Sequence, residues 1–393
     1  MTMSSDVSKG VELARQRCRA GDLQTARQLI EDVLRTEPSN VDALLLAAEV
    51  YRLGGNLQLA SKVYARVGQL DPQRPEAPAG LALLYYEQGQ AERCEQCLDA
   101  TLDLDPVYLR RRYYSHMAAA RQSGGKGDKM VDFYARIAAA YQRLIERYPA
   151  SPLLAFNLAR VLFALGEPEL AAEAYGRCLH VDPDMTEAYA GMAQVSLVLE
   201  RYEDAVGWCK LLEGRTWAVT GGDPDDPDWM STRAADGELS LGQAYLVQAK
   251  AHLWMGQFEE TGQAIRRAVE MEPWNSAEWY ADFLEEHIKL GRALMDNKQL
   301  PEAIQVLESG RDVAERLEYH RLFLWLAQAY AAQAAACREA KDEAQAKSYA
   351  ARAREILAKP PVPVPPDARA AWDKLKERVS AEDSSGLFGF LRR

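Results

Sequence analysis

The stretch AGDLQTARQLIEDVLRTEP, residues Ala20–Pro38, contains a pattern that the chain repeats at a fixed interval. A glycine is followed five residues later by a small residue, and a proline closes the segment. The pattern begins again in GGNLQLASKVYARVGQLDP and in QGQAERCEQCLDATLDLDP, so that Gly21, Gly55 and Gly89 lie 34 residues apart. Similarity at a constant period predicts tandem structural repeats that share one local fold.

Each repeat has the pattern of two short helices joined by a turn. In the second repeat, one set of apolar residues has the i, i+3, i+4, i+7 spacing of a helical face, and another set follows the break at Gly55 and Asn56. The two sets are Leu44, Ala47, Ala48 and Tyr51, and then Ala60, Tyr64 and Val67. Helices this short are unstable alone, and a pair of them still exposes an apolar flank. Successive pairs must therefore stack, which predicts an all-α, right-handed α-solenoid of about nine helix-turn-helix pairs.

The residue types that recur in the repeats fit this packing. A small residue lets two helix backbones approach where they cross, as expected at Ala26, Ala60, Cys94 and Ala171. Glycine accepts the positive φ of a tight turn, as expected at Gly21, Gly55, Gly89, Gly166 and Gly256. Proline stops the second helix, as expected at Pro38, Pro72, Pro106, Pro183 and Pro273.

Two segments carry enough of the pattern to point to a family. Asp42–Pro72 and Leu154–Pro183 place bulky, small and aromatic residues on the first helix, then glycine, alanine, an aromatic residue and proline across the second. The later segment also contains Asn157-Leu158-Ala159. The array resembles tetratricopeptide repeat (TPR) proteins of the bacterial type. The resemblance implies that a peptide or amphipathic helix of a partner binds on the concave surface lined by the first helix of each pair.

Departures from the period divide the chain into segments. Residues 1–212 are predicted to form an N-terminal TPR array, in which RQSGGKGDKM, Arg121–Met130, lengthens one repeat. An acidic loop insertion at 213–240 precedes a C-terminal TPR array at 241–359. Residues 360–366 include five prolines and are expected to form an extended linker. Residues 367–393 are expected to form a capping helix, which closes the end of the array, and a hydrophobic and basic tail.

Composition and charge narrow the classes of partner and the compartment. The net charge of −11, from 58 acidic and 47 basic residues, repels a phosphate backbone and argues against nucleic acid as a partner. No apolar run approaches the roughly 18 residues of a membrane span, and the first residues lack the regions of a secretory signal. Six cysteines without a compact framework are expected to be free thiols. These features predict a cytoplasmic protein.

Motifs for catalysis or metal binding are incomplete. CEQC, Cys94–Cys97, lacks the second pair of ligands that zinc requires. SGGKGDK, Ser123–Lys129, fails as a phosphate loop because Ala120 and Gly127 stand where a glycine and a hydroxyl are needed. GDPDDPDW, Gly222–Trp229, lacks the central glycine and distal glutamate of a calcium loop. The sequence therefore predicts no cofactor, no metal and no catalytic residue.

The first helix of each pair supplies the candidate contacts for a partner. These positions combine apolar and charged side chains, which suits an amphipathic segment. They include Arg15, Leu45, Glu49, Arg52, Leu83, Tyr86, Phe156, Asn157 and Arg160. The alternative is that part of this set packs against the neighbouring pair. A carboxylate clamp like that of chaperone co-factors is not expected, because Glu187 and Gly191 occupy the places of its basic residues.

The most basic local run in this acidic chain is LRRRYYSHM, Leu109–Met117. Arginine and tyrosine side chains can bind an anionic or acidic-peptide partner through bidentate and stacking contacts. On a helix, however, these residues point in several directions, and Tyr114, Met117 and Ala118 fit the structural stripe. The favoured interpretation is a solvated face that contributes at most one partner contact.

The C-terminal tail is a second candidate contact. Ser384, Ser385 and Gly386 are expected to form a flexible tether after the capping helix. The apolar and basic residues beyond it are predicted to be a linear recognition motif for a partner, made by Leu387, Phe388, Phe390, Leu391 and Arg392. Docking onto the chain's own groove is the second alternative, and peripheral contact with an anionic membrane is the third.

These features predict a non-catalytic protein–protein interaction scaffold or assembly factor. One alternative is an adaptor subunit of a secretion, pilus or envelope machine, which differs from the scaffold only in its partner. An alternative of another class is an enzyme that uses residues 213–240 as a lid over its active site.

Overall fold

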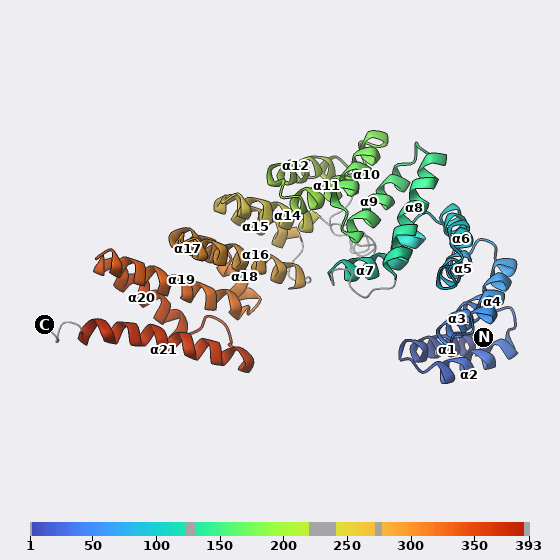
Figure 1. The fold of residues 1–393 in the computed structure, drawn as a ribbon, viewed down its shortest axis with the longest axis horizontal. Helices are drawn as coiled ribbons and strands as arrows, with labels where there is room; N and C mark the ends of the chain where they lie inside the picture. Colours follow the sequence, from blue (N-terminus) through green and yellow to red (C-terminus); the bar gives the residue numbers. More distant parts are fainter. Residues whose placement is uncertain (1, 123–129, 220–240, 272–276, 389–393) are drawn as a thin grey trace. The chain divides into compact units, whose positions relative to one another are not determined.

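The computed structural model describes residues 2–122, 130–219, 241–271 and 277–388, with side chains described within 7–121, 130–213, 242–270 and 280–380. In these ranges nearly all residues are helical and none forms a strand. The chain divides into two compact units, residues 1–188 and residues 189–393. Within each unit, successive helices pair and stack side by side (Figure 1). The predicted all-α helical repeat fold is confirmed.

Unit 1 holds five helix pairs. They are α1 (Thr2–Arg19) with α2 (Leu23–Thr36), α3 (Val41–Leu53) with α4 (Leu57–Leu70), α5 (Glu76–Glu87) with α6 (Ala91–Leu104), α7 (Tyr108–Gln122) with α8 (Val131–Arg147), and α9 (Pro152–Leu165) with α10 (Pro168–Val181). The fourth pair differs from the others, because α7 packs more extensively on α9 than on α8. Most of the lengthening segment predicted at Arg121–Met130 lies between these two helices, and its residues 123–129 are outside the described ranges.

Unit 2 continues the pattern and ends in an additional helix. Its elements are α11 (Thr186–Val198) and α12 (Tyr202–Val219), α14 (Leu241–Trp254) and α15 (Phe258–Met271), α16 (Ala277–Asp296) with α17 (Leu300–Ser309) and α18 (Arg311–Arg316), α19 (His320–Glu339) and α20 (Glu343–Ala358), and α21 (Pro366–Phe388). The boundary between the units falls in the first turn of α11. None of the described helices is both long enough and apolar enough to span a membrane.

The turns of the repeats depend on residues with positive φ. All five predicted turn glycines have it, with φ of 79° at Gly21 and Gly55, 70° at Gly89, 88° at Gly166 and 73° at Gly256. Non-glycine residues take the same conformation in three later turns, with φ of 59° at Glu200, 61° at Lys298 and 62° at Lys341. The left-handed turn is therefore retained where the glycine is not, at a cost of about 1 kcal/mol per residue.

The ends of the helices follow from capping residues and prolines. The side chains of Asp22, Asn40 and Asn56 each accept a hydrogen bond from a backbone amide in the first turn of the helix that follows. Helices α2, α4, α6 and α10 each end two residues before a predicted closing proline. The residue just before each of these prolines has left the helical region, as the proline ring requires. Pro273 lies outside the described residues.

Small residues lie where the helices cross. Ala26, Ala60, Cys94 and Ala171 are all fully buried, which confirms the predicted close approach. Gly80 of α5 packs even more closely, since a Cβ atom built there would lie 2.3 Å from the ring of Tyr64.

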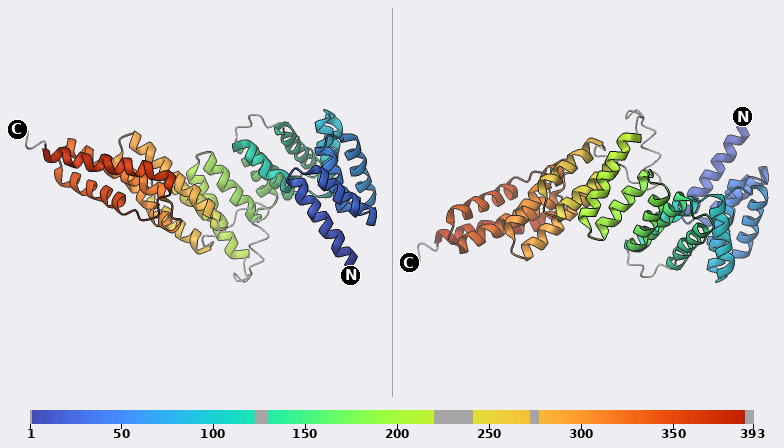
Figure 2. Two further views of the ribbon diagram at one scale, coloured as in Figure 1. Left: turned by 90° about the horizontal axis from the view of Figure 1, so that it is seen from below. Right: turned by 90° about the horizontal axis from the view of Figure 1, so that it is seen from above.

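Helix α21 closes unit 2. Trp372, Leu375 and Val379 are buried in the unit 2 core, and the indole Nε1 of Trp372 donates a hydrogen bond of 3.1 Å to the carbonyl oxygen of Leu357 in α20. In both views of Figure 2, α21 runs alongside α20. The backbone of α21 stays helical through Ser384–Gly386, so the tether expected there is wrong. Serine and glycine reduce helix propensity by only about 1 kcal/mol or less each, and no proline interrupts the segment.

Candidate partner-binding surface

The candidate contacts of unit 1 lie on its first-helix face, the surface formed by α1, α3, α5, α7 and α9. On α3, Arg52 makes two hydrogen bonds to the Glu49 carboxylate, of 3.0 and 2.6 Å, and a third of 2.6 Å to Glu87 on α5. The hydroxyl of Tyr64 also donates to Glu49, at 3.3 Å. Arg52 therefore joins two successive repeats while its side chain stays 14% exposed.

The surroundings of Glu49 favour its charged form. Burial opposes the charge on Glu49, but the hydrogen bonds and positive charge of Arg52 outweigh it and lower the pKa of the carboxyl group. Burial and the neighbouring Glu49 carboxylate raise the pKa of Tyr64, so its hydroxyl stays a donor. Arg15 on α1 is exposed and pairs with Glu12 at 2.8 Å. The network thus presents fixed charges, whereas Arg15 can move with little loss of stability.

The apolar candidates on α3 and α5 are only partly accessible. Leu45 is half-buried and packs against the cores of the second and third repeats. Leu83 is buried, and the ring of half-buried Tyr86 lies 5.2 Å from that of Phe133 on α8. Leu53 at the end of α3 is 46% exposed, and sequence reasoning did not select it. Its position two residues before the turn glycine is the signal that could have placed it on this face.

The three candidates on α9 are buried. The exposed fractions of Phe156, Asn157 and Arg160 are 2%, 0% and 3%. Asn157 Nδ2 donates to the carbonyl oxygen of Pro106 at 3.2 Å, and the guanidinium of Arg160 lies 4.6 Å from the ring centroid of Tyr114. These contacts arise because α7 packs on α9, and they favour the alternative that this part of the set packs against the neighbouring pair.

The arginines of the basic run have different surroundings. Arg110 is buried with its guanidinium 5.8 Å from the ring of Phe156, whereas Arg111 and Arg112 are exposed. Near the end of α7, the exposed Arg121 lies 5.2 Å from the ring of Phe163 and donates to the carbonyl oxygen of the same residue at 3.1 Å. Tyr113 and Met117 of the run are buried, as is Leu109. The run thus supplies both core contacts and exposed cations.

Matches to protein-family models decide the identity of the repeats. Two models described as tetratricopeptide repeat match the chain, one at residues 53–119 and the other at residues 11–75, 133–178 and 156–219. The chain is a tetratricopeptide repeat protein. The matches cover repeats of unit 1 and the first pair of unit 2.

Curated proteins related to this TPR protein match only part of their own length. Protein CTR9 homolog of Arabidopsis thaliana is 37% identical over 87 residues, which is 22% of this chain and 8% of that protein. TPR repeat-containing protein YpiA of Bacillus subtilis (strain 168) is 18% identical over 250 residues, which is 64% of this chain and 52% of that protein. The chain therefore spans less than two thirds of either relative.

Solved TPR structures resemble the chain at the level of the repeat. YrrB, described as a TPR protein with an unusual peptide-binding site, is 18% identical, with coverage of 57% of this chain and 95% of that chain and a TM-score of 0.32. PilW, described as a type IV pilus biogenesis factor, is 16% identical, with coverage of 68% and 94% and a TM-score of 0.29. At these TM-scores the likeness carries no argument about ligand or partner.

The first helices of unit 2 present a different set of side chains, which sequence reasoning missed. Trp254 on α14 donates from Nε1 to Glu286 on α16 at 3.1 Å, and the Lys289 ammonium lies 5.5 Å from its ring centroid. Also on α16, the guanidinium of Arg292 lies 4.7 Å from the ring centroid of Trp325 on α19. Trp254 stands two residues before its turn glycine, which is again the signal that could have placed it.

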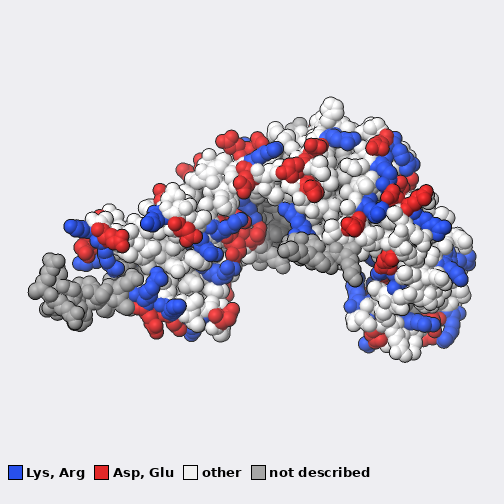
Figure 3. All heavy atoms as spheres, in the orientation of Figure 1, with Lys and Arg blue, Asp and Glu red and all other residues white. Residues whose placement is uncertain are grey.

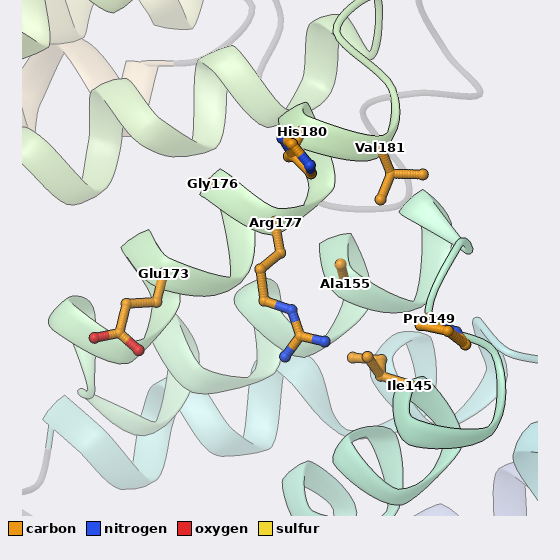
Figure 4. Close-up of a pocket in the computed structure, with 8 residues that line it drawn as sticks. All are labelled: Ile145, Pro149, Ala155, Glu173, Gly176, Arg177, His180 and Val181. Atoms are coloured by element: carbon orange, nitrogen blue, oxygen red, sulfur yellow. The ribbon is translucent and has the colours of Figure 1, made fainter.

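A shallow apolar groove lies on the second-helix side of unit 1 (Figure 4). It has a volume of about 510 Å³ and is lined by Ile145, Pro149, Ala155, Gly176 and Val181, with Glu173, Arg177 and His180 also lining it. A side chain added at Gly176 would meet open space, so the groove reaches the surface of α10. The groove contains none of the predicted partner contacts.

The CEQC motif lies inside α6. Burial raises the pKa of both Cys94 and Cys97 to about 11, so both thiols are protonated near neutral pH and are poor nucleophiles and metal ligands. All six cysteines of the chain are free. Among the described side chains, no group of three or more histidines, cysteines and carboxylates is placed to hold a metal ion.

Two predicted elements fall largely outside the described residues. Helix α12 extends to Val219, and residues 220–240 of the acidic insertion are not described. Of the tail motif, Leu387 and Phe388 are the last residues of α21, whereas Phe390, Leu391 and Arg392 lie beyond the described range. The roles of the insertion and of the tail stay predictions.

Proposed function

We propose that this TPR protein is a non-catalytic protein-interaction scaffold, and that a peptide or helix of a partner binds on the first-helix face of unit 1. The observation that carries the proposal is the junction of α3 and α5. There the exposed Leu53 and the half-buried Leu45 lie on α3 with Arg52, and the half-buried Tyr86 lies beside Glu87, the ion-pair partner of Arg52 on α5. Apolar anchors beside charges that are already held in place suit an amphipathic segment, because little ordering remains to be done on binding.

An assembly-factor role in the cytoplasm belongs to the same proposal. The free state of all six cysteines agrees with a reducing compartment. The inter-repeat bonds of Arg52 support a scaffold, because they keep successive first helices in register while the surface around them stays open. The partners of the chain are to be identified from the peptides that it binds.

The test is a selection of peptides from a random display library by the purified full chain, followed by Kd measurements on two matched variants. Leu53→Glu places a charge on the first-helix face, and Leu170→Glu makes the same change on α10, where the leucine is also 46% exposed. The selected peptides should bind at least tenfold more weakly to Leu53→Glu than to the unchanged chain, with little effect of Leu170→Glu. Equal effects of the two variants, with unchanged circular dichroism, would place the binding surface elsewhere.

A further inference from the structure

Helices α7 and α9 are cationic in an acidic chain. Their sequences, YLRRRYYSHMAAARQ and PLLAFNLARVLFAL, contain five arginines and no aspartate or glutamate, although the net charge of the chain is −11. The two helices pack on each other within unit 1. Positive charge is therefore concentrated on these two helices, whereas the face of the molecule drawn in Figure 3 shows acidic and basic side chains side by side.

Aromatic rings orient three of these arginines. The guanidinium carbons of Arg160, Arg110 and Arg121 lie 4.6, 5.8 and 5.2 Å from the ring centroids of Tyr114, Phe156 and Phe163. A guanidinium held against a ring keeps its planar fork of N–H donors, which matches a carboxylate. Of the three, only Arg121 is exposed, so a partner that binds to it loses less conformational entropy because the ring already restricts its side chain.

The exposed cations lie near the two ends of α7. Arg111 and Arg112 are in its first turns and Arg121 is in its last, and all three are exposed. At 3.6 residues per turn and a rise of about 1.5 Å per residue, Arg111 and Arg121 lie on the same side of α7, about 15 Å apart along its axis. Arg112 lies on the side opposite to Arg121. An extended peptide spans the distance between Arg111 and Arg121 with about four residues. Half-buried Tyr114 and Phe163 offer apolar surface next to these cations.

We propose that this surface, the α7–α9 patch formed by the exposed Arg111 and Arg121 above the buried Arg110 and Arg160, binds an acidic segment of a partner protein. The proposal rests on the scaffold function above and names the chemistry of its partner. Carboxylates of the segment pair with the exposed arginines at the two ends of α7, and an apolar side chain between them contacts Tyr114 or Phe163. The two buried arginines add positive potential beneath the segment.

A protein segment fits the patch better than a nucleic acid does. Binding to a phosphate backbone gains its strength from the neutralisation of many phosphates along a continuous basic surface. Here three exposed arginines occupy one helix, and the rest of the chain carries an excess of carboxylates. A short segment with carboxylates at two places uses Arg111 and Arg121 without extending onto the acidic surface around them.

The test is a fluorescence anisotropy titration of the full chain with a labelled synthetic peptide of about twelve residues, in which two Glu pairs flank a spacer of about four residues with one Leu and one Phe. A second peptide replaces each Glu by Gln. The double variant Arg111→Glu/Arg112→Glu is compared with Lys62→Glu/Arg66→Glu, which makes the same charge change at two exposed positions of α4. Circular dichroism checks that both variants fold.

The Glu peptide is expected to bind the unchanged chain at least tenfold more tightly than the Gln peptide does. The Kd of the Glu peptide should rise at least tenfold in Arg111→Glu/Arg112→Glu and less than twofold in Lys62→Glu/Arg66→Glu. Its Kd should also rise between about 50 and 500 mM NaCl. Equal losses in the two variants would overturn the proposal, as would stronger binding of a single-stranded oligonucleotide of equal charge. If the Glu peptide fails while library-selected peptides still depend on Leu53, the scaffold function stands and the acidic partner is refuted.

Discussion

His287 is expected to make the stability of unit 2 depend on pH. Its imidazole is fully buried on α16, with Nδ1 3.0 Å from the carbonyl oxygen of Phe283 and the ring 4.4 Å from that residue's phenyl ring. Nε2 is buried without a hydrogen-bond partner in the described structure. Burial lowers the pKa of His287 to about 4, although the hydrogen bond to Phe283 acts in the opposite direction. The folded unit therefore excludes the protonated form.

The sign and the size of the effect follow from this lowered pKa. In the unfolded chain the imidazole has its ordinary pKa of about 6.5, so the unfolded state binds the proton more readily than the folded state. The stability is fully present above pH 6.5 and is lost as the pH falls from about 6.5 to about 4. The total loss is on the order of 3 kcal/mol, of which about 2 kcal/mol falls between pH 7 and pH 5.

Tryptophan fluorescence isolates this effect, because all 8 tryptophans of the chain lie beyond residue 188 and report on unit 2. Urea unfolding at pH 7 and pH 5 is compared in the unchanged chain, in His287→Leu and in His180→Gln, whose histidine is exposed in unit 1. Between pH 7 and pH 5, the free energy of unfolding should fall by about 2 kcal/mol more in the unchanged chain and in His180→Gln than in His287→Leu. An equal loss in His287→Leu would show that His287 does not cause the pH dependence.

Three further predictions concern the repeats. In thermal melts followed by far-UV circular dichroism, Gly80→Ala should lower the melting temperature of unit 1 by an amount equivalent to about 1–3 kcal/mol, because the added Cβ meets the Tyr64 ring. The control Gly68→Ala, whose Cβ meets open space, should be neutral or stabilising in the same melts. Lys341→Gly should stabilise unit 2 by up to about 1 kcal/mol in urea unfolding, by relieving a φ of 62°; a destabilised variant would mean that the turn carries no strain. Trp372→Ala should lower the free energy of unfolding of unit 2 by about 3–5 kcal/mol in the same assay, because it opens a cavity and leaves a carbonyl oxygen of α20 without its donor. A loss below about 1 kcal/mol would show that α21 is not part of the core.

The sequence alone determines the elements that every repeat needs locally. The 34-residue period, the small residues at Ala60 and Ala171 and the turn at Gly55 were readable because each repeat solves the same packing problem with the same residue types. Turns without glycine carried a weaker signal. Lys298 and Lys341 adopt the left-handed conformation only because the packed helices on either side hold it.

Only the tertiary structure decided which first-helix residues reach solvent. Arg160 has the same position relative to its turn glycine as the exposed Arg15 of the first repeat, yet it is buried, because α7 packs on α9 rather than mainly on α8. In the same arrangement Arg110 is buried, whereas Arg111, the next residue of the basic run, is exposed. Periodicity fixes the face of a helix on which a residue lies. Whether a neighbouring helix covers that face depends on contacts between residues that are distant in the chain, and a local pattern does not record them.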